Sequence, residues 1–173
     1  MGTGSVGSAQ LTPLAMNVPG HASGWRFVSE GKYFTCASHT DDSVWCWGEN
    51  DGGEAAQGNF TNPQTTPAQV GTGSNWQTVV AGRFHACARR ADATLWCWGD
   101  NQVGSVGVPG MIKYDTPQHV ISPSSWSTVA PMNTSVCAFD ATTQLYCWGD
   151  NTFGSLGLGD TVDRATPTLV TLP

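Results

Sequence analysis

The chain has 173 residues, a formal net charge of -6, and only 12% charged residues, against about 25% in an ordinary globular protein. Its seven basic residues are scattered, which argues against nucleic-acid binding and against attachment to an anionic membrane surface, since both need clustered cations. No stretch approaches the roughly 20 apolar residues of a membrane span. Eight tryptophans supply material for a core, so the composition also excludes intrinsic disorder.

Three landmarks recur along the chain at intervals of about 50 residues, a period found in propeller repeats. A Cys-Trp-Gly-(Glu/Asp)-Asn motif stands at 46–50, 97–101 and 147–151, and a Thr-Pro pair stands at 66–67, 116–117 and 166–167. A tryptophan near the start of each copy keeps the same register. We therefore divide the chain into the second half of a preceding repeat with a linker, followed by three full repeats, at 1–24, 25–75, 76–125 and 126–173.

Each repeat contains the signals of about four short strands. In the second repeat they lie at 76–81, 85–89, 95–98 and 117–120, separated by Gly, Asn, Asp and Pro. No segment keeps the 3.6-residue apolar period of a helix. The expected fold is therefore all-β: three four-stranded antiparallel β-propeller blades plus a partial repeat. Because closed propellers need about 4–8 blades, this would be an incomplete propeller on its own.

The second repeat carries the clearest motif. Trp-x-x-Val-x-Ala-Gly-x-x-His-x-Cys-Ala is followed by Leu-Trp-Cys-Trp-Gly-Asp-Asn-x-x-Gly-x-x-Gly and then by Thr-Pro-x-x-Val. This pattern is similar to the regulator of chromosome condensation repeat, in a cysteine-bearing variant. The resemblance implies a propeller, commonly of seven blades, that binds other proteins. Known members include a nuclear exchange factor for a small GTPase, a secreted β-lactamase inhibitor and receptor-kinase ectodomains. Their activities do not transfer with the repeat.

The partial first repeat leaves two arrangements open. Either the chain is a piece of a longer propeller, or copies associate with one another. If the Thr-Pro-x-x-Val strand belongs to the blade that follows it, residues 12–18 would complete the first blade. The strand at 166–170 would then pair with a neighbouring copy, closing a ring or growing a filament.

The six cysteines are expected to form three disulfides, one in each central hairpin. A three-residue loop at 40–42 would place the first two cysteines directly opposite each other, at a distance that a disulfide spans. The alternative is six buried thiols. Three disulfides would indicate an oxidising, extracellular or cell-surface location. The predicted pairs are Cys36 with Cys46, Cys87 with Cys97, and Cys137 with Cys147.

The tryptophans and two sequons complete the predicted sites. Because Trp and Cys alternate along a strand, the tryptophans point away from the sulfur and are expected to pack between blades. A platform for stacking a glycan or peptide is the alternative. The blade-packing residues are Trp25, Trp47, Trp76, Trp98, Trp126 and Trp148, and the candidate N-glycosylation sites are Asn59 and Asn133.

No residue pattern in the chain predicts catalysis, a cofactor or a metal. The Gly2-x-Gly4-x-x-Gly7 match to a dinucleotide fingerprint recurs as a repeat loop, and the chain has no Gly-x-Ser-x-Gly. A zinc site is not expected because the histidines hold no ligand spacing with the cysteines. The Asp-Asn pairs after Cys-Trp-Gly are interpreted as turns, with calcium at 49–54 as the alternative. His85 is expected to make a structural hydrogen bond.

These observations favour a non-enzymatic, extracellular module for protein–protein interaction or structural assembly. Its partner would be another protein or other copies of itself. The alternative is a secreted lectin or ligand-binding propeller that uses aromatic loop residues, with a glycan as its ligand. A third hypothesis, regulation of a small GTPase like that of an exchange factor, requires a reducing compartment and therefore free thiols.

Overall fold

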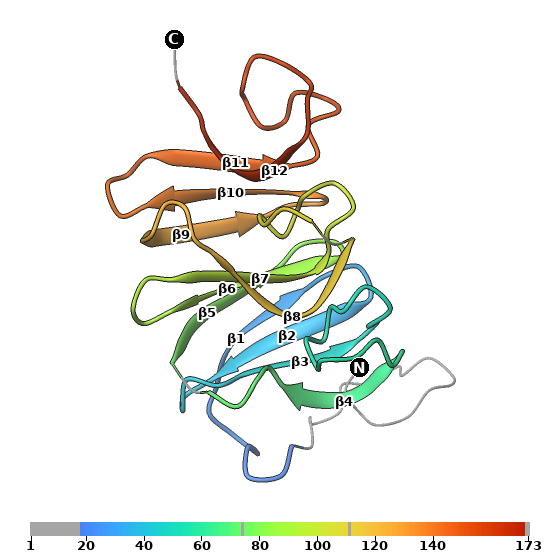
Figure 1. Ribbon diagram of the computed structural model, residues 1–173. Helices are drawn as coiled ribbons and strands as arrows, with labels where there is room; N and C mark the ends of the chain where they lie inside the picture. The colour runs from blue at the N-terminus through green and yellow to red at the C-terminus, as the bar shows by residue number, and fades with distance from the viewer. Residues whose placement is uncertain (1–17, 74, 111, 172–173) are drawn as a thin grey trace.

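The computed structural model describes residues 18–73, 75–110 and 112–171, which form twelve β-strands and no helix. Figure 1 shows three antiparallel four-stranded sheets stacked in chain order, so the predicted architecture of three blades is confirmed. The first blade contains β1 (Trp25–Glu30), β2 (Phe34–His39), β3 (Val44–Gly48) and β4 (Gln64–Gln69). The second contains β5 (Trp76–Ala81), β6 (His85–Arg90), β7 (Leu95–Asp100) and β8 (Lys113–Val120). The third contains β9 (Trp126–Pro131), β10 (Ser135–Asp140), β11 (Leu145–Gly149) and β12 (Arg164–Leu169).

Two predicted features fall at the edge of what the structure describes. The glycine-rich segment at 2–7 and most of the partial repeat at 1–24 lie outside the described residues. Among the described residues, no helix is long and apolar enough to cross a bilayer.

A disulfide joins the two middle strands of every blade. In the first blade, Cys36 of β2 lies directly opposite Cys46 of β3, with a 4.1 Å separation of their Cα atoms. The hairpin closes at His39, whose N–H donates to the carbonyl oxygen of Ser43 over 3.0 Å and leaves the expected three-residue loop. The other two blades repeat this geometry. Their disulfides are Cys87–Cys97 and Cys137–Cys147.

Successive blades pack face to face. The face of one blade that carries its disulfide, called the disulfide face, contacts the face of the next blade that carries its tryptophans, called the tryptophan face. The disulfide of the first blade lies in a core with Trp76 and Trp98 of the second, and the disulfide of the second blade lies in a core with Trp126 and Trp148 of the third. All four tryptophans are buried. The alternation of cysteine and tryptophan along β7 sends the two side chains to opposite faces. Every blade therefore has one face of each kind.

Hydrogen bonds fix the depth at which these tryptophans insert. The indole N–H of Trp98 donates to the carbonyl oxygen of Glu54 over 2.9 Å. In the next blade, the indole N–H of Trp148 donates to the carbonyl oxygen of Ser105 over 3.1 Å. Glu54 and Ser105 both lie in the loop before the last strand of the preceding blade. Each tryptophan thus ties its own blade to its neighbour's loop, which satisfies a buried polar group at the same time.

The Thr-Pro strand belongs to its own repeat, so the idea that it completes the following blade is wrong. β4, which contains Thr66 and Pro67, pairs with β3 of the same blade. β8 and β12 pair in the same way with β7 and β11. The sheet hydrogen bonds decide the matter, because β12 is taken up by β11 and is not left for a neighbouring copy.

The contact between loop and tryptophan generates a first prediction. Gly107 and Gly159 both adopt a φ of +80°, so alanine introduces similar backbone strain at the two positions. A Cβ at Gly107 would also lie 2.8 Å from Nε1 of Trp148, whereas at Gly159 it would meet nothing within 4 Å. Gly107→Ala should therefore lower the free energy of unfolding by roughly 1–3 kcal/mol more than Gly159→Ala. Urea unfolding with the disulfides intact measures both values, and equal effects would contradict the packing described.

Candidate functional site

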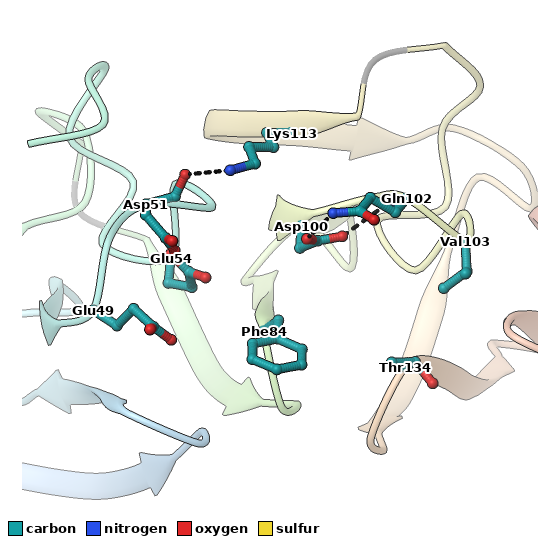
Figure 2. A pocket seen from close by; sticks show the side chains of 9 residues that line it. All are labelled: Glu49, Asp51, Glu54, Phe84, Asp100, Gln102, Val103, Lys113 and Thr134. Carbon is teal, nitrogen blue, oxygen red and sulfur yellow. Dashed lines mark hydrogen bonds between the residues drawn. The ribbon is translucent and has the colours of Figure 1, made fainter. Parts of the chain in front are cut away.

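An acidic pocket opens between the blades at the ends of their loops (Figure 2). Its volume is about 360 Å³. In Figure 2, three acidic residues of the β3–β4 segment line one side, and residues of the second blade together with Thr134 of the third line the other, with the Phe84 ring between them. The lining residues are Glu49, Asp51, Glu54, Phe84, Asp100, Gln102, Val103, Lys113 and Thr134.

A buried asparagine shapes the loop on each blade that carries such residues. In the first blade, Oδ1 of Asn50 accepts the backbone N–H of Ala55 over 2.9 Å. Its Nδ2 donates to the carbonyl oxygens of Asn59 and Thr61. Asn101 and Asn151 accept equivalent bonds in the other two blades. The asparagine that follows Cys-Trp-Gly therefore has a structural role in every repeat, because it replaces backbone pairing inside a long loop.

The acidic residues beside these asparagines divide into two groups. Asp100 and Asp150 accept the backbone N–H two residues ahead, each over 2.9 Å, so both form the turns that the sequence indicated. Glu49, Asp51 and Glu54 instead bring carboxylate oxygens within 4.8 Å of one another. Lys113 donates from Nζ to the backbone carbonyl of Asp51 over 2.8 Å.

Burial changes the protonation of this cluster. Glu54 is 1% exposed, and burial raises its pKa from 4.5 to about 7, although the backbone N–H of Gly52 stabilises the charged form by donating to Oε2 over 2.9 Å. Burial and the nearby Asp51 also raise the pKa of Glu49. Near neutral pH the cluster therefore carries less negative charge than its composition implies. The Phe84 ring beside it already contacts two cations of this chain, because Lys32 lies 5.2 Å and Arg83 lies 4.9 Å from the ring centroid.

His85 does not make the predicted hydrogen bond through Nε2, which is buried without a partner among the described residues. Burial lowers its pKa to about 4, so the ring is neutral. A Cβ at Gly82 would lie 2.4 Å from the His85 ring, and a Cβ at Gly31 would lie 2.1 Å from Phe34 in the equivalent position of the first blade. The first and second blades thus share an aromatic ring packed against a glycine at this position. The role of the His85 side chain is therefore packing.

Among the described residues, no further blade covers either outer face of the stack. Val28 of the first blade is 71% exposed, whereas the equivalent Val79 of the second blade is 3% exposed in the first core. Trp25 and Trp47 lie on the same face as Val28, beside a shallow pocket, but Trp47 is only 7% exposed and Trp25 is half-buried against the linker, where its indole N–H donates to the carbonyl oxygen of His21. The predicted packing residues thus divide into four that are enclosed between blades and two that face this end.

The opposite end exposes the disulfide face of the third blade. Leu145 and Val170 are half-buried there, whereas Leu95 and Val120, their equivalents in the second blade, are fully buried in the second core. A groove of about 530 Å³ runs across this face. It is lined by Phe139, Thr143, Gln144, Leu145, Leu169, Val170 and Thr171.

Both candidate glycosylation asparagines are exposed in loops. Asn59 Oδ1 accepts the backbone N–H of Thr61 within its own sequon over 2.9 Å. Asn133 accepts Nη1 of Arg83 over 3.3 Å, and its backbone carbonyl also accepts the Arg83 N–H. Asn133 is therefore held against the neighbouring blade through Oδ1, whereas Asn59 is bonded within its own loop, where its Nδ2 also donates to the carbonyl oxygen of Gln57 over 3.1 Å.

One cluster was missed because its residues come together only in the fold. The structure places His21 and His39 on either side of the Asp41 carboxylate, beside the first hairpin loop. Spacing relative to cysteine could not reveal this, since the linker before β1 supplies one ring and the end of β2 supplies the other. The His-x-Asp pattern at 39–41 was the one local signal.

The raised pKa of Glu54 generates a second prediction. Because the folded pKa is above the unfolded value, the stability due to this group is present at low pH and is lost as pH rises from 4.5 through about 7. Glu54→Gln removes that loss. Relative to the parent chain, the variant should gain roughly 1–3 kcal/mol of unfolding free energy between about pH 5 and about pH 8.

Urea unfolding across the pH range checks this result. His85 titrates in both proteins with the opposite slope, so its contribution cancels in the difference. Glu30→Gln, at an exposed position of β1, is the matched control and should show no such gain. A constant difference between Glu54→Gln and the parent chain at every pH would contradict the buried, protonated carboxyl.

Solved structures share this arrangement of blades. Yeast RCC1 (Prp20), in its complex with Kap60, superposes with a TM-score of 0.79 at 20% identity, over 86% of this chain and 37% of that one. Human WBSCR16 gives a TM-score of 0.75 at 19% identity, over 86% of this chain and 40% of that one. The ectodomain of the Physcomitrella patens receptor kinase CR4 gives 0.51 at 20% identity, over 79% and 33%. These likenesses establish the fold alone.

Curated relatives match part of the chain. Human probable E3 ubiquitin-protein ligase HERC4 is 29% identical over 83 residues, which is 47% of this chain and 8% of that protein. The Danio rerio protein RCC2 homolog is 30% identical over 78 residues, which is 42% of this chain and 16% of that protein. The chain thus spans less than a fifth of the length of these relatives.

Sequence models of the repeat locate the similarity. Two models described as the regulator of chromosome condensation (RCC1) repeat match residues 25–54 and 76–105, and residues 41–89 and 144–173, respectively. Together they cover more than half of the chain and include parts of all three blades. With the blade architecture, these matches show that the chain belongs to the RCC1 repeat family.

Proposed function

We propose that this chain is a non-catalytic, extracellular assembly module whose two open blade faces bind each other head to tail between copies. The observation that carries the proposal is the difference in exposure between equivalent residues. Val28 is exposed where Val79 is buried, and Leu145 is half-buried where Leu95 is fully buried. The open ends thus expose side chains that are enclosed wherever another blade is present.

The outer faces of the first and third blades are of the two kinds that pack against each other inside the stack. The first blade offers a tryptophan face with the exposed Val28, and the third blade offers a disulfide face with the groove at Leu145 and Val170. Tryptophan against disulfide is the contact that already joins each pair of successive blades. A second copy of the chain carries the face that each end lacks. A heterologous contact of this kind repeats from copy to copy and either closes a ring or extends a filament.

The disulfides support the extracellular part of the proposal. All six cysteines are paired, and each disulfide closes a hairpin with a sequence separation of 10. Disulfides persist in oxidising compartments and are rare in the cytosol. The exposed Asn59 sequon is consistent with the same location. Alkylation of the native protein followed by intact-mass measurement tests this part of the proposal. Labelling of the cysteines would contradict it.

The alternatives have less support from the described contacts. A lectin would use exposed aromatic loop residues such as Tyr33, Phe60 and Phe153, but none of the three lines the acidic pocket or the pockets at the two outer faces. Yeast RCC1 is described as binding Gsp1p and histones, and a small-GTPase regulator remains the third hypothesis on that fold likeness alone.

Analytical ultracentrifugation of paired variants tests head-to-tail association. The parent chain should form species larger than a monomer, with a mass that rises with protein concentration. Val28→Asp blocks the tryptophan face and Leu145→Asp blocks the disulfide face, because an unpaired charge in the buried contact is strongly unfavourable. Each variant alone should be monomeric. An equimolar mixture should form dimers and stop there, since only one intact face of each kind remains.

The control and the contrary outcomes are equally specific. Phe153→Asp alters a side chain that is 93% exposed and outside both faces, so it should assemble like the parent chain. A folded parent chain that stays monomeric at every concentration would contradict the proposal. So would single variants that still assemble, because the contact would then lie elsewhere.

A further inference from the structure

We propose that His21, His39 and Asp41 form a binding site for a divalent transition-metal ion such as zinc. Nε2 of His21 lies 3.0 Å from Oδ2 of Asp41, and Nδ1 of His39 lies 2.9 Å from Oδ1. One ligand atom from each of the three residues fits within a span of 4.8 Å. The site lies at the open edge of the first hairpin, where the Asp41 side chain is 48% exposed.

The far nitrogens of both rings are already held by backbone carbonyls. His21 donates from Nδ1 to the carbonyl oxygen of Pro19 over 3.1 Å, and His39 donates from Nε2 to the carbonyl oxygen of Ser23 over 2.7 Å. A histidine that ligates a metal typically donates its other ring N–H in this way, which fixes the tautomer and the direction of the lone pair. In both rings the nitrogen left for a metal is the one that faces Asp41.

The contact at His39 calls for a cation. The backbone N–H of Asp41 donates to Nδ1 of His39 over 3.3 Å, so Nδ1 carries a lone pair in that arrangement. Oδ1 of Asp41, 2.9 Å from the same nitrogen, is an acceptor that also receives the N–H and hydroxyl of Ser43. Two acceptors this close repel each other unless a proton or a metal ion lies between them, and a metal ion would take the Nδ1 lone pair in place of the long bond from the Asp41 N–H.

Comparison of the blades separates this cluster from ordinary turn geometry. In the second blade Asp92 receives the same two bonds from Thr94, so the turn requires no histidine. The residue equivalent to His39 there is Arg90, whose guanidinium carbon lies 4.5 Å from the Trp76 ring centroid and 4.2 Å from that of Trp96. A fixed cation therefore occupies this position in one blade. The two histidines are additions particular to the first.

The donor set selects the class of ion. Two imidazole nitrogens and one carboxylate suit Zn²⁺, Cu²⁺, Ni²⁺ or Co²⁺, whereas Ca²⁺ and Mg²⁺ prefer all-oxygen sites. Three protein ligands leave a coordination position for water or for a side chain of a partner. The rings of Trp25 and Trp45 lie 6.3 and 4.9 Å from the ring of His21, close enough for a bound paramagnetic ion to quench their fluorescence.

Titration of the untagged chain with Co²⁺ and Zn²⁺ tests the site. Isothermal titration calorimetry should show one Zn²⁺ per chain, and Co²⁺ should produce visible absorption bands and quench tryptophan fluorescence. His21→Ala should weaken binding at least about tenfold. His39→Arg should do the same without loss of fold, because arginine stands naturally at the equivalent position 90. Circular dichroism confirms that both variants are folded.

The matched control is His119→Ala, which removes a histidine stacked on Trp96 in the second blade and should leave binding unchanged. Absence of Zn²⁺ and Co²⁺ binding to the parent chain would overturn the proposal. So would binding that survives in both His21→Ala and His39→Arg, since the ion would then sit at another cluster. Calcium in excess should not displace the bound Co²⁺.

Discussion

The packing of one blade's disulfide face against the next blade's tryptophan face is the contact on which the rest of this structure depends. It buries Cys87 and Cys97 under Trp126 and Trp148, and the same arrangement encloses the disulfide of the first blade. Each sheet is thin and gains a second covered face only from its neighbour, so a blade is not a stable unit by itself. The disulfide adds about 2–3 kcal/mol in the chain-entropy description by closing a short loop within each hairpin.

The candidate sites are attached to this frame. The carbonyl oxygen of Glu54 accepts the indole N–H of Trp98, so the loop that carries the acidic cluster is positioned by the contact between blades. The histidine cluster depends instead on the hairpin loop of one blade, which folds back over the linker before β1. The contact between disulfide face and tryptophan face thus recurs between successive blades. The acidic cluster and the histidine cluster instead depend on loop residues that differ from blade to blade.

Sequence reasoning predicted the repeated parts of the fold and failed where a contact had no repeat. The cysteines recur at the same position of each repeat, and a three-residue loop separates the two strands that carry them, so the disulfides could be predicted. The tryptophans that alternate with these cysteines indicated how the blades pack. The partner of the Thr-Pro strand was not determined, because sheet pairing within a blade and with the next blade fit the same motif. The lack of a partner for Nε2 of His85 and the approach of His21 to Asp41 depend on tertiary packing, which local spacing does not encode.

Amide hydrogen exchange at several protein concentrations tests the central claim most directly, because it reports on each blade separately. In dilute solution, β6 and β7 of the middle blade should be protected most, since both of their faces are covered. As concentration rises, protection of β2, β3, β10 and β11 should increase toward that of the middle blade, because association covers the two outer faces. Protection of the outer blades that does not change with concentration would contradict the account.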